Sequence, residues 1–413
     1  MLTSENLKTA ETTERALDIK EYAELYREEL LNNILPFWLE KSRDYKNGGY
    51  FTCLDREGLV YDSDKFIWLQ GREVWCFSFM YNQVEQKKEW LDMAVQGAEF
   101  MKKFGRDTEG NWYFSLTAEG KPLIQPYNIF SDCFAAMAFA SLEKAVPGQG
   151  YGEIAVKTFE NILLRKENWK GQYNKAFPGT RPLKSFALPM ILCNLSLEME
   201  PLIGTERVDR FIPEVIHEVM DVFYKPGLGL IVENVLENGE LSDSYEGRLL
   251  NPGHSIEAMW FIMDLGKRLN DMPLIEKAKN IMLQTLEYGW DKQYNGIFYF
   301  IDRKGAPLQQ LEWDQKLWWV HVEALVALAK GIKLTGDENC VRWFEKVHNY
   351  TWKHFRDTDH REWFGYLNRR GEVLLDLKGG KWKGCFHIPR ALFQVWKTLE
   401  EDKSQIELTL KQG

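Results

Sequence analysis

The chain has 413 residues, of which 45% are hydrophobic and 27% charged, and its mean hydropathy is −0.40. This composition excludes a disordered chain and predicts a globular protein with a large buried core. The formal net charge of −9 offers no attraction for nucleic acid or anionic lipid, and no apolar run approaches the roughly 18 residues that a membrane span needs. We therefore expect no nucleic-acid or membrane partner.

The six cysteines are scattered along the chain and form no C-x-x-C pair, which argues against a disulfide scaffold, a redox motif and a zinc site. A reducing compartment suits such a chain, and the polar N-terminus lacks an apolar signal region. We expect a cytoplasmic protein whose residues 1–18 form a flexible or peripheral segment.

Short aromatic-rich segments that end in glycine recur at intervals of 59 to 66 residues. The glycines are Gly58, Gly120, Gly179, Gly239, Gly305 and Gly371, and the segment before Gly179 is the most degenerate. Apolar and polar residues alternate before each glycine, which predicts a short hairpin. Each interval leaves room for two helices.

The segment after each hairpin is apolar nearly all round, which is typical of a buried helix. These inner segments are 68–81, 130–143, 183–197, 253–266, 317–331 and 386–399. Other segments place apolar residues at i, i+3, i+4 and i+7, the mark of a helix with one buried face. They include 84–105, 274–290 and 340–355.

Units of hairpin, inner helix and outer helix, repeated six times, predict an all-α (α/α)6 barrel with short β-hairpins between helix pairs at one end. We expect residues 1–413 to form this barrel as a single domain. An open helical solenoid is the alternative, because the same local repeat permits it.

Polar residues recur 12 to 18 positions after the turn glycines, near the start of the inner segments. They are Arg72, Asp132, His254, His321, Glu323 and His387. In a closed ring, groups at matching phase converge on the mouth of the barrel. This convergence favours closure and predicts a site there.

Two of these histidines carry a charged partner three residues later, Glu257 after His254 and Arg390 after His387, so each pair shares a helix face. Arg72 lies among aromatic residues, and its burial requires either a structural carboxylate or an oxygen-rich ligand.

His321 and Glu323 are two positions apart and cannot both point at one spot, so we place Glu323 in the pocket and His321 behind it. The remaining histidines are expected on the surface: His217, His348, His354 and His360.

Two imidazoles on opposite sides of a bound molecule can remove a proton from one face of a carbon and return it to the other. If that carbon lies next to a carbonyl, the intermediate is an enediolate, whose negative charge Arg72 can stabilise. The chain contains no P-loop, dinucleotide fingerprint, H-E-x-x-H or G-x-S-x-G motif. This chemistry needs no cofactor, and we expect no metal site.

At these residues the chain resembles the N-acylglucosamine 2-epimerase family, which includes the renin-binding proteins, over about residues 20 to 400. The matching segments are WLQGREVW, YNIFSDCFAAMAFA, PGTRPLKSFALPM, NPGHSIEAMWF, KLWWVHVEALVA and KGCFHIPRALF. The resemblance implies an (α/α)6 barrel, commonly a homodimer, that interconverts N-acetyl-D-glucosamine and N-acetyl-D-mannosamine. It also implies ATP as an activator that is not consumed.

Position by position, His254 and His387 match the two catalytic bases of the family, and Arg72 matches its enolate-binding arginine. Glu257 and Glu323 match its pocket acids, and Arg390 matches the arginine after the second histidine. We expect His254, His387, Arg72 and Glu323 to be catalytic, with Glu323 or Arg390 assisting sugar opening. The expected substrate-binding residues are Glu257, Arg390, Trp68, Trp319 and Asp132.

Other functions stay open at this stage. Mannose or cellobiose 2-epimerases and aldose–ketose isomerases belong to the same superfamily. An inverting glycoside hydrolase would need two separated carboxyl groups, which Asp132, Glu257 and Glu323 could supply. A protein-binding module is the third class, but it would leave a charged, tryptophan-lined cavity without a purpose.

Overall fold

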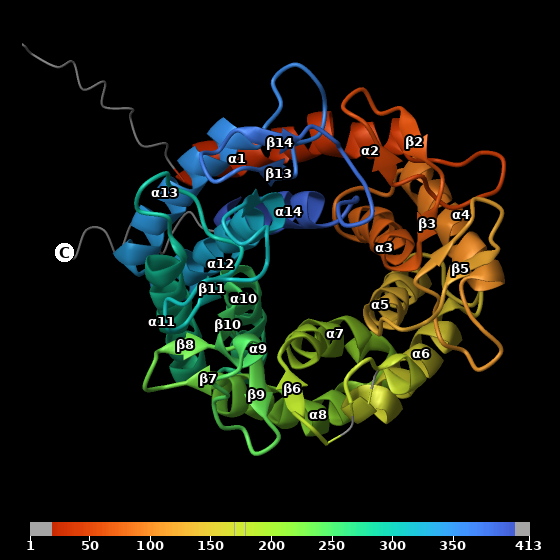
Figure 1. Cartoon of the computed structure of the whole chain (residues 1–413). Coiled ribbons are helices and arrows are strands. Elements are labelled where there is room, and N and C mark those ends of the chain that lie inside the picture. Colours follow the sequence, from red (N-terminus) through yellow and green to blue (C-terminus); the bar gives the residue numbers. More distant parts are fainter. Residues whose placement is uncertain (1–18, 169, 178, 401–413) are drawn as a thin grey trace, which may run out of the picture.

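The structure is a computed structural model that describes residues 19–168, 170–177 and 179–400. Its helices form a ring in two layers around a central axis (Figure 1). The N-terminal segment 1–18, predicted to be flexible or peripheral, lies outside the described residues. None of the helices in the described ranges is long and apolar enough to cross a bilayer.

The inner layer consists of helices that are buried nearly all round, as predicted from their composition. They are α3 (Ile67–Gln83), α5 (Phe130–Ala145), α7 (Ala187–Ile203), α10 (Pro252–Leu269), α12 (Trp318–Thr335) and α14 (His387–Glu400). In α12, every residue from Trp318 to Ala329 is buried. Polar side chains on such helices must therefore find partners inside the ring.

The outer layer consists of helices with one buried face. They are α1 (Ile19–Glu29), which continues through a π-helical turn (Leu30–Ile34) into α2 (Leu35–Lys41), and α4 (Lys88–Phe104), α6 (Tyr151–Arg165), α8 (Thr205–His217), α11 (Met272–Gly289) and α13 (Glu338–His354). Helix α4 packs on α3, α6 on α5, α8 on α7, α11 on α10 and α13 on α12. Each outer helix thus covers the inner helix that precedes it in the chain.

The two ends of the described chain close the ring. Helix α1 packs on α14, so the first outer helix covers the last inner helix. Helices α14 and α3 meet through aromatic contacts, with ring centroids 5.2 Å apart for Trp75 and Phe386 and 4.9 Å apart for Phe79 and Phe393. The barrel is therefore closed, and the open solenoid is excluded.

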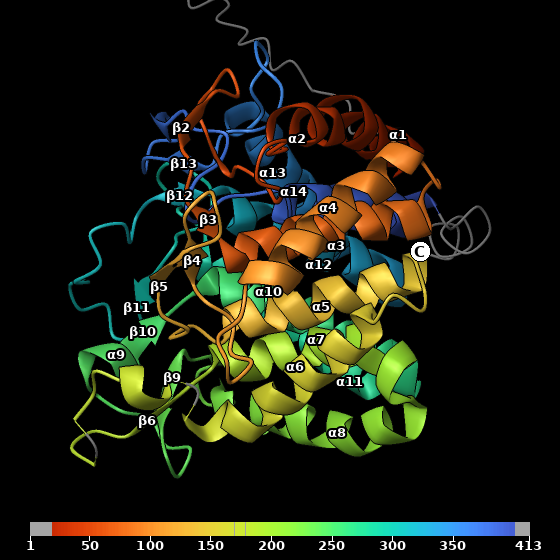
Figure 2. The same cartoon turned by 90° about the vertical axis from the view of Figure 1, so that its right-hand side faces the viewer.

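Short strands gather at one end of the ring (Figure 2). They are β1 (Cys53–Leu54), β2 (Val60–Asp62), β3 (Lys65–Phe66), β4 (Ser115–Leu116), β5 (Pro122–Ile124), β6 (Leu183–Ser185), β7 (Tyr224–Lys225), β8 (Leu230–Ile231), β9 (Asn234–Leu236), β10 (Leu249–Leu250), β11 (Ile301–Asp302), β12 (Lys316–Leu317), β13 (Tyr366–Leu367) and β14 (Val373–Leu375). A single-turn helix, α9 (Tyr245–Arg248), lies among them.

The predicted hairpins form around three of the turn glycines, with antiparallel pairs β1–β2, β4–β5 and β13–β14. Around Gly239 and Gly305 the preceding strand pairs elsewhere, β9 with β6 and β11 with β10. No strand flanks Gly179 directly in the described residues. All six glycines have positive φ, from +71° to +88°, so the repeated turn is a backbone requirement that glycine meets best.

Buried lysine–aspartate pairs tie these strands to the turns that follow outer helices. Lys65 on β3 contacts Asp44 at 2.7 Å, and Lys316 on β12 contacts Asp291 at 3.1 Å. The same aspartates accept backbone N–H groups of their own turns, for example from Gln293. Burial alone would raise the pKa of Asp291, but these partners hold it at about 2. The strands that lead into α3 and α12 are therefore held in place by buried charge.

Gly71 marks the closest approach between α3 and α5. A Cβ atom at this position would lie 2.8 Å from the backbone oxygen of Phe134. Backbone cannot move aside as a flexible side chain can, so the glycine sets the spacing of these two helices and with it the position of Arg72.

We predict that Gly71→Ala lowers the free energy of unfolding by about 1–3 kcal/mol, because the added methyl overpacks two helix backbones. Gly227→Ala is the matched control, since a Cβ at Gly227 meets nothing within 4 Å. Thermal and denaturant unfolding of both variants measures the effect. Equal stability of Gly71→Ala and wild type would contradict the role of this contact.

Candidate active site

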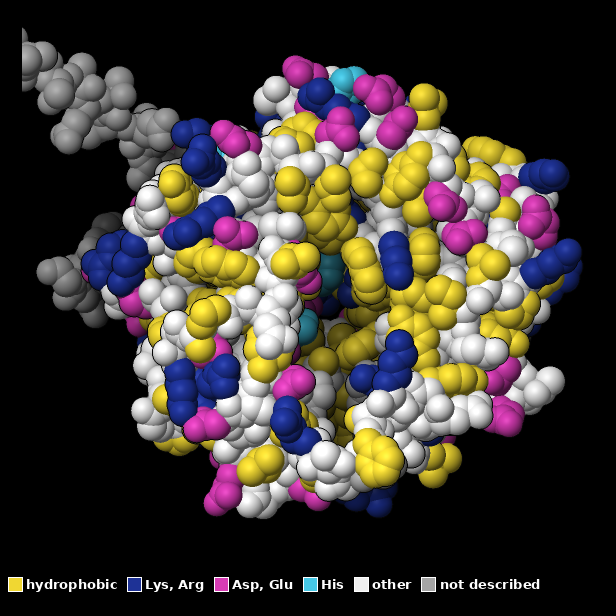
Figure 3. All heavy atoms as spheres, viewed as in Figure 1, with side chains coloured by type: hydrophobic (Ala, Val, Ile, Leu, Met, Phe, Trp, Pro, Cys, Tyr) yellow, Lys and Arg dark blue, Asp and Glu magenta, His cyan; other side chains and the backbone are white. Residues whose placement is uncertain are grey.

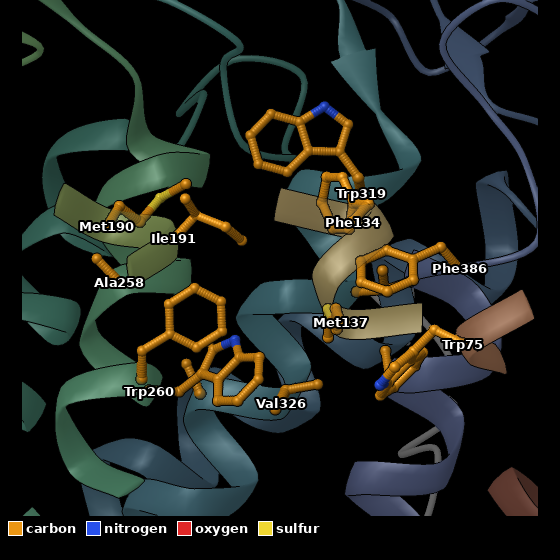
Figure 4. Close-up of a cluster of buried hydrophobic side chains, with 14 of the residues drawn as sticks. Trp75, Phe134, Met137, Met190, Ile191, Ala258, Trp260, Trp319, Val326 and Phe386 are labelled. Atoms are coloured by element: carbon orange, nitrogen blue, oxygen red, sulfur yellow. The ribbon is translucent and has the colours of Figure 1, made fainter. Parts of the chain in front are cut away.

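The centre of the ring is hollowed at the end where the strands gather, and histidine side chains are visible inside the hollow (Figure 3). Inner helices begin at this end, so residues in their first turns face one another across the axis. The apolar side chains deeper in the barrel come from different inner helices and gather around the axis (Figure 4). Of the predicted site residues, Trp319 is part of this apolar cluster (Figure 4).

His387 is the first residue of α14. Its Nδ1 lies 2.7 Å from Oε1 of Glu323 on α12. A ring whose Nδ1 is bound to a carboxylate keeps Nε2 free for another partner. The side chain is 9% exposed, so this nitrogen works in a nearly dry environment.

Glu323 is held by three side chains, one of which is His387. Both of its oxygens are bound, Oε1 to His387 and to Arg390 at 2.6 Å, and Oε2 to the indole N–H of Trp260 at 2.9 Å. The side chain is fully buried. Glu323 is therefore placed to orient and polarise His387, and a direct action of Glu323 on the substrate stays a prediction.

Arg390 lies between two carboxylates. Its guanidinium donates to both Glu257 and Glu323 and packs over the ring of Phe386. The side chain is 2% exposed, and its Nε and Nη1 are buried without a partner in the described structure, so the contact between Arg390 and the sugar stays a prediction. Its positive charge also offsets the cost of burying the two acids.

Glu257, Glu323 and His387 each place one possible ligand atom within 4.8 Å of the others, a spacing that could hold a metal ion. Arg390 already binds both carboxylates. We assign the charge balance of this cluster to the arginine, and the expectation that no metal takes part stays a prediction.

His254 lies at the start of α10, where the side chain of Asn251 caps the helix by accepting the backbone N–H of His254. Its Nδ1 is 3.0 Å from Oε2 of Glu233, and its side chain keeps 27% exposure. Glu233 was missed in the sequence, because it follows a strand rather than an inner-helix start. No motif or spacing in the sequence predicts the contact between Glu233 and His254.

Trp319 connects the two histidines. The centroid of its indole is 5.3 Å from the ring of His254 and 5.8 Å from the ring of His387. The imidazole planes of His254 and His387 are inclined to the indole plane by 37° and 36°, respectively. Both imidazoles therefore contact one indole ring and lie in the same part of the barrel, and their placement on opposite faces of a sugar carbon stays a prediction.

Arg72 is a buried cation among aromatic rings. Its guanidinium carbon is 4.1 Å from the ring centroid of Phe134, 4.4 Å from that of Trp68 and 4.7 Å from that of Phe386. No salt bridge joins it to a carboxylate among residues 19–400 as far as they are described. Burial lowers its pKa to about 9, with Glu257 acting in the opposite direction.

Trp68 lies beside Arg72 and is half-buried, and its indole N–H is buried without a partner in the described structure. An unpaired arginine next to an unpaired N–H suits a ligand rich in oxygen atoms. The predicted sugar-binding role of Trp68 and Trp319 fits this arrangement.

The pKa values of the two histidines are shifted in opposite directions. Burial lowers the pKa of His254, but Glu233 outweighs it and the pKa ends above its ordinary value. The pKa of His387 lies well below its ordinary value because of burial and then the neighbouring Arg72 and Arg390. At neutral pH one imidazole is therefore suited to donate a proton and the other to accept one.

Asp132 does not join this group. It is fully buried and forms an ion pair with Arg165 of the outer helix α6 at 2.5 Å. The predicted sugar contact of Asp132 is therefore corrected to a link between layers. His348, expected on the surface, is buried and contacts the hydroxyl of Tyr26 at 3.0 Å.

His321 also serves the fold, behind the pocket as expected. Its Nδ1 lies 2.7 Å from the carbonyl oxygen of Leu317, and its Nε2 accepts the backbone N–H of Ile297. Burial lowers its pKa to about 3, so the ring is neutral and links two chain segments.

Comparison with known proteins shows the family and the fold of this chain. The N-acylglucosamine 2-epimerase of Bos taurus is 38% identical over 374 residues, covering 88% of this chain and 87% of the relative. The cellobiose 2-epimerase of Bacteroides fragilis is 24% identical over 395 residues, with 89% and 97% covered.

The solved structure of cellobiose 2-epimerase from Bacillus thermoamylovorans B4167 has a TM-score of 0.79 to this chain at 20% identity, covering 91% of this chain and 99% of that one. This similarity establishes the fold. Residues 49–391 match the family model described as N-acylglucosamine 2-epimerase (GlcNAc 2-epimerase). The chain thus belongs to the N-acylglucosamine 2-epimerase family.

Proposed function

We propose that this protein is a sugar 2-epimerase that interconverts N-acetyl-D-glucosamine and N-acetyl-D-mannosamine by proton transfer at C2. The observation that carries the proposal is the placement of His254 and His387 against one indole ring, each held through Nδ1 by its own carboxylate. The similarity to N-acylglucosamine 2-epimerases supports the choice of substrate.

The reaction follows from the two rings. In the open-chain sugar, C2 lies next to the aldehyde carbonyl, so its proton is acidic enough for a neutral imidazole to remove. Nε2 of one histidine takes this proton, and the electron pair passes to the carbonyl oxygen as an enediolate. The second histidine, which is protonated before the reaction starts, then delivers the proton on its Nε2 to the opposite face of C2. One proton leaves and one arrives, so the sugar changes only its configuration.

Arg72 stabilises the charge that develops on the oxygen. Its guanidinium is buried and has no carboxylate partner in the described residues. The positive charge of Arg72 is therefore not offset by a protein carboxylate when a substrate oxygen binds. Such preorganised charge contributes most where water is excluded. Glu323 or Arg390 assists opening of the sugar ring in this proposal, since both lie beside His387.

The inverting hydrolase is disfavoured by the same geometry. Asp132 pairs with Arg165 of an outer helix, and Glu257 and Glu323 both bind the same nitrogen of Arg390 and so lie side by side. An inverting mechanism needs two separated carboxyl groups.

The proposal extends, on family resemblance, to ATP as an activator that is not consumed, to a homodimer and to a cytoplasmic location. ATP activation and the oligomeric state are tested as separate arms of the substrate experiment.

Loss of one histidine should separate the two half-reactions. We predict that His387→Asn lowers epimerisation by at least about 10²-fold while the fold stays intact, and that His254→Asn does the same. In D2O the wild type should place one deuterium at C2 of the product. Each variant should still exchange the C2 proton of one epimer, and the two variants should differ in which epimer they exchange.

His217→Asn is the matched control, since His217 is exposed on α8 and pairs with Asp221. NMR of the C2 proton follows both exchange and epimerisation. If either variant epimerises at the wild-type rate, or the wild-type product carries no deuterium, the two-base mechanism is wrong.

We predict that Arg72→Met lowers kcat about 10²–10³-fold with a smaller effect on KM, because the oxyanion charge exists only after proton removal. Methionine keeps most of the packing between the aromatic rings. Arg210→Met on the exposed side of α8 is the control. A variant that changes KM alone would assign Arg72 to ground-state binding.

A substrate panel should rank N-acetylglucosamine and N-acetylmannosamine above mannose, glucose and cellobiose in kcat/KM. Each sugar is assayed with and without ATP, and sedimentation gives the oligomeric state in both conditions. Faster turnover of an unsubstituted sugar would replace the proposed substrate while leaving the family chemistry in place.

A further inference from the structure

We propose that Glu233 is the positioning residue of His254: it holds the ring with Nε2 free for the sugar and keeps it as the proton donor of the resting enzyme, with His387 as the base. This inference rests on the proposed function. Neither the motifs in the sequence nor the family resemblance points to Glu233.

Glu233 is held rigidly by the backbone around it. It lies between β8 and β9, where its carbonyl accepts the N–H of Phe186 at 2.9 Å and its own N–H donates to the carbonyl of Leu249 at 3.4 Å. Phe186 directly precedes α7 and Leu249 begins β10, so two separate elements hold this residue. A carboxylate on such a frame can impose one orientation on an imidazole.

The charge of Glu233 is directed at His254 alone. Its Oε2 contacts Nδ1 of the ring at 3.0 Å, and its Oε1 is buried without a partner in the described structure. The only ion pair of Glu233 within the described ranges is the one with His254. A nearly buried carboxylate with one partner strongly favours the charged form of that partner.

The pair of His387 and Glu323 looks similar but differs in its third member. Arg390 donates to the same Oε1 that His387 contacts, so the carboxylate charge is already shared with a cation. Arg72 adds a second positive charge near His387. The pKa values of the two histidines are therefore shifted in opposite directions: burial, Arg72 and Arg390 lower that of His387, whereas Glu233 raises that of His254 against the effect of burial.

The remaining groups around His254 do not reverse this assignment. Glu257 on its own helix acts in the same direction as Glu233. On the neighbouring helices, Trp319 is uncharged and His387 is electrostatically coupled to His254. Tyr299, beside Glu233, has a pKa raised by burial and is neutral at physiological pH.

The arrangement has a consequence for pH dependence. The enzyme is active when one histidine is protonated and the other is neutral. A plot of kcat/KM against pH is therefore bell-shaped. The acid limb reports protonation of His387, and the alkaline limb reports loss of the proton from His254. Glu233 raises the pKa of His254 and thereby extends activity toward higher pH.

The test is Glu233→Gln, which keeps an acceptor for Nδ1 but removes the charge. We predict that its alkaline limb moves to lower pH by about one unit, a tenfold loss of kcat/KM on that side, with the acid limb in place. Glu237→Gln is the matched control, since Glu237 is exposed in the same strand-and-turn segment. Glu233→Asp should restore part of the shift.

Titration of the histidine ring by NMR provides a readout without turnover. The His254 signal should titrate at lower pH in Glu233→Gln than in the wild type and in Glu237→Gln. This measurement distinguishes the inference from the proposed function, because it holds even if the sugar is a different one. An unchanged His254 titration, or a wild-type pH profile in folded Glu233→Gln, would overturn the inference.

Discussion

Closure of the helix ring is the constraint from which the site follows. Helix α1 covers α14, and aromatic side chains join α14 to α3, so the first and last inner helices become neighbours. Once the ring is closed, the starts of α10, α12 and α14 face a common axis. Residues more than 130 positions apart, such as His254 and His387, then share contacts with one tryptophan.

The buried charges near this axis are paired with opposite charges, except for Arg72, which a substrate oxygen can bind. Arg390 compensates Glu257 and Glu323, and Glu233 is compensated by His254. Arg72 has no carboxylate partner in the described residues, and its burial among aromatic rings costs free energy that a bound oxygen can offset. The site thus stores an unpaired positive charge where the proposed reaction develops a negative one.

The functional difference between the two histidines comes from their neighbours. Both rings are anchored through Nδ1 to a glutamate, yet only one glutamate is shared with an arginine. The same chemical group can therefore serve as acid on one side of the sugar and as base on the other. Two histidines with equal surroundings would have equal pKa values, so the surroundings would not determine which of them carries the proton.

The repeat spacing predicted the barrel, the alternation of inner and outer helices and the positions of His254, His387 and Arg72 near its mouth. These features depend on local periodicity and on turn glycines, and both can be read along the chain. The direction of individual side chains was not predictable in this way. Asp132 has the phase of a site residue but faces Arg165, and Glu323 is enclosed by partners from two other helices.

The sequence by itself therefore determined the architecture, the pair of imidazoles and their common end of the barrel, because hydrophobic period and repeat phase are properties of neighbours in the chain. Only the tertiary structure decided which charges meet. Glu233 reaches His254 from a strand-linked segment, and Arg390 on α14 reaches Glu257 on α10 past the helix α12 that lies between them. The strength of an ion pair depends on the distance between the charges and on the exclusion of water, and the spacing of residues along the chain predicts neither.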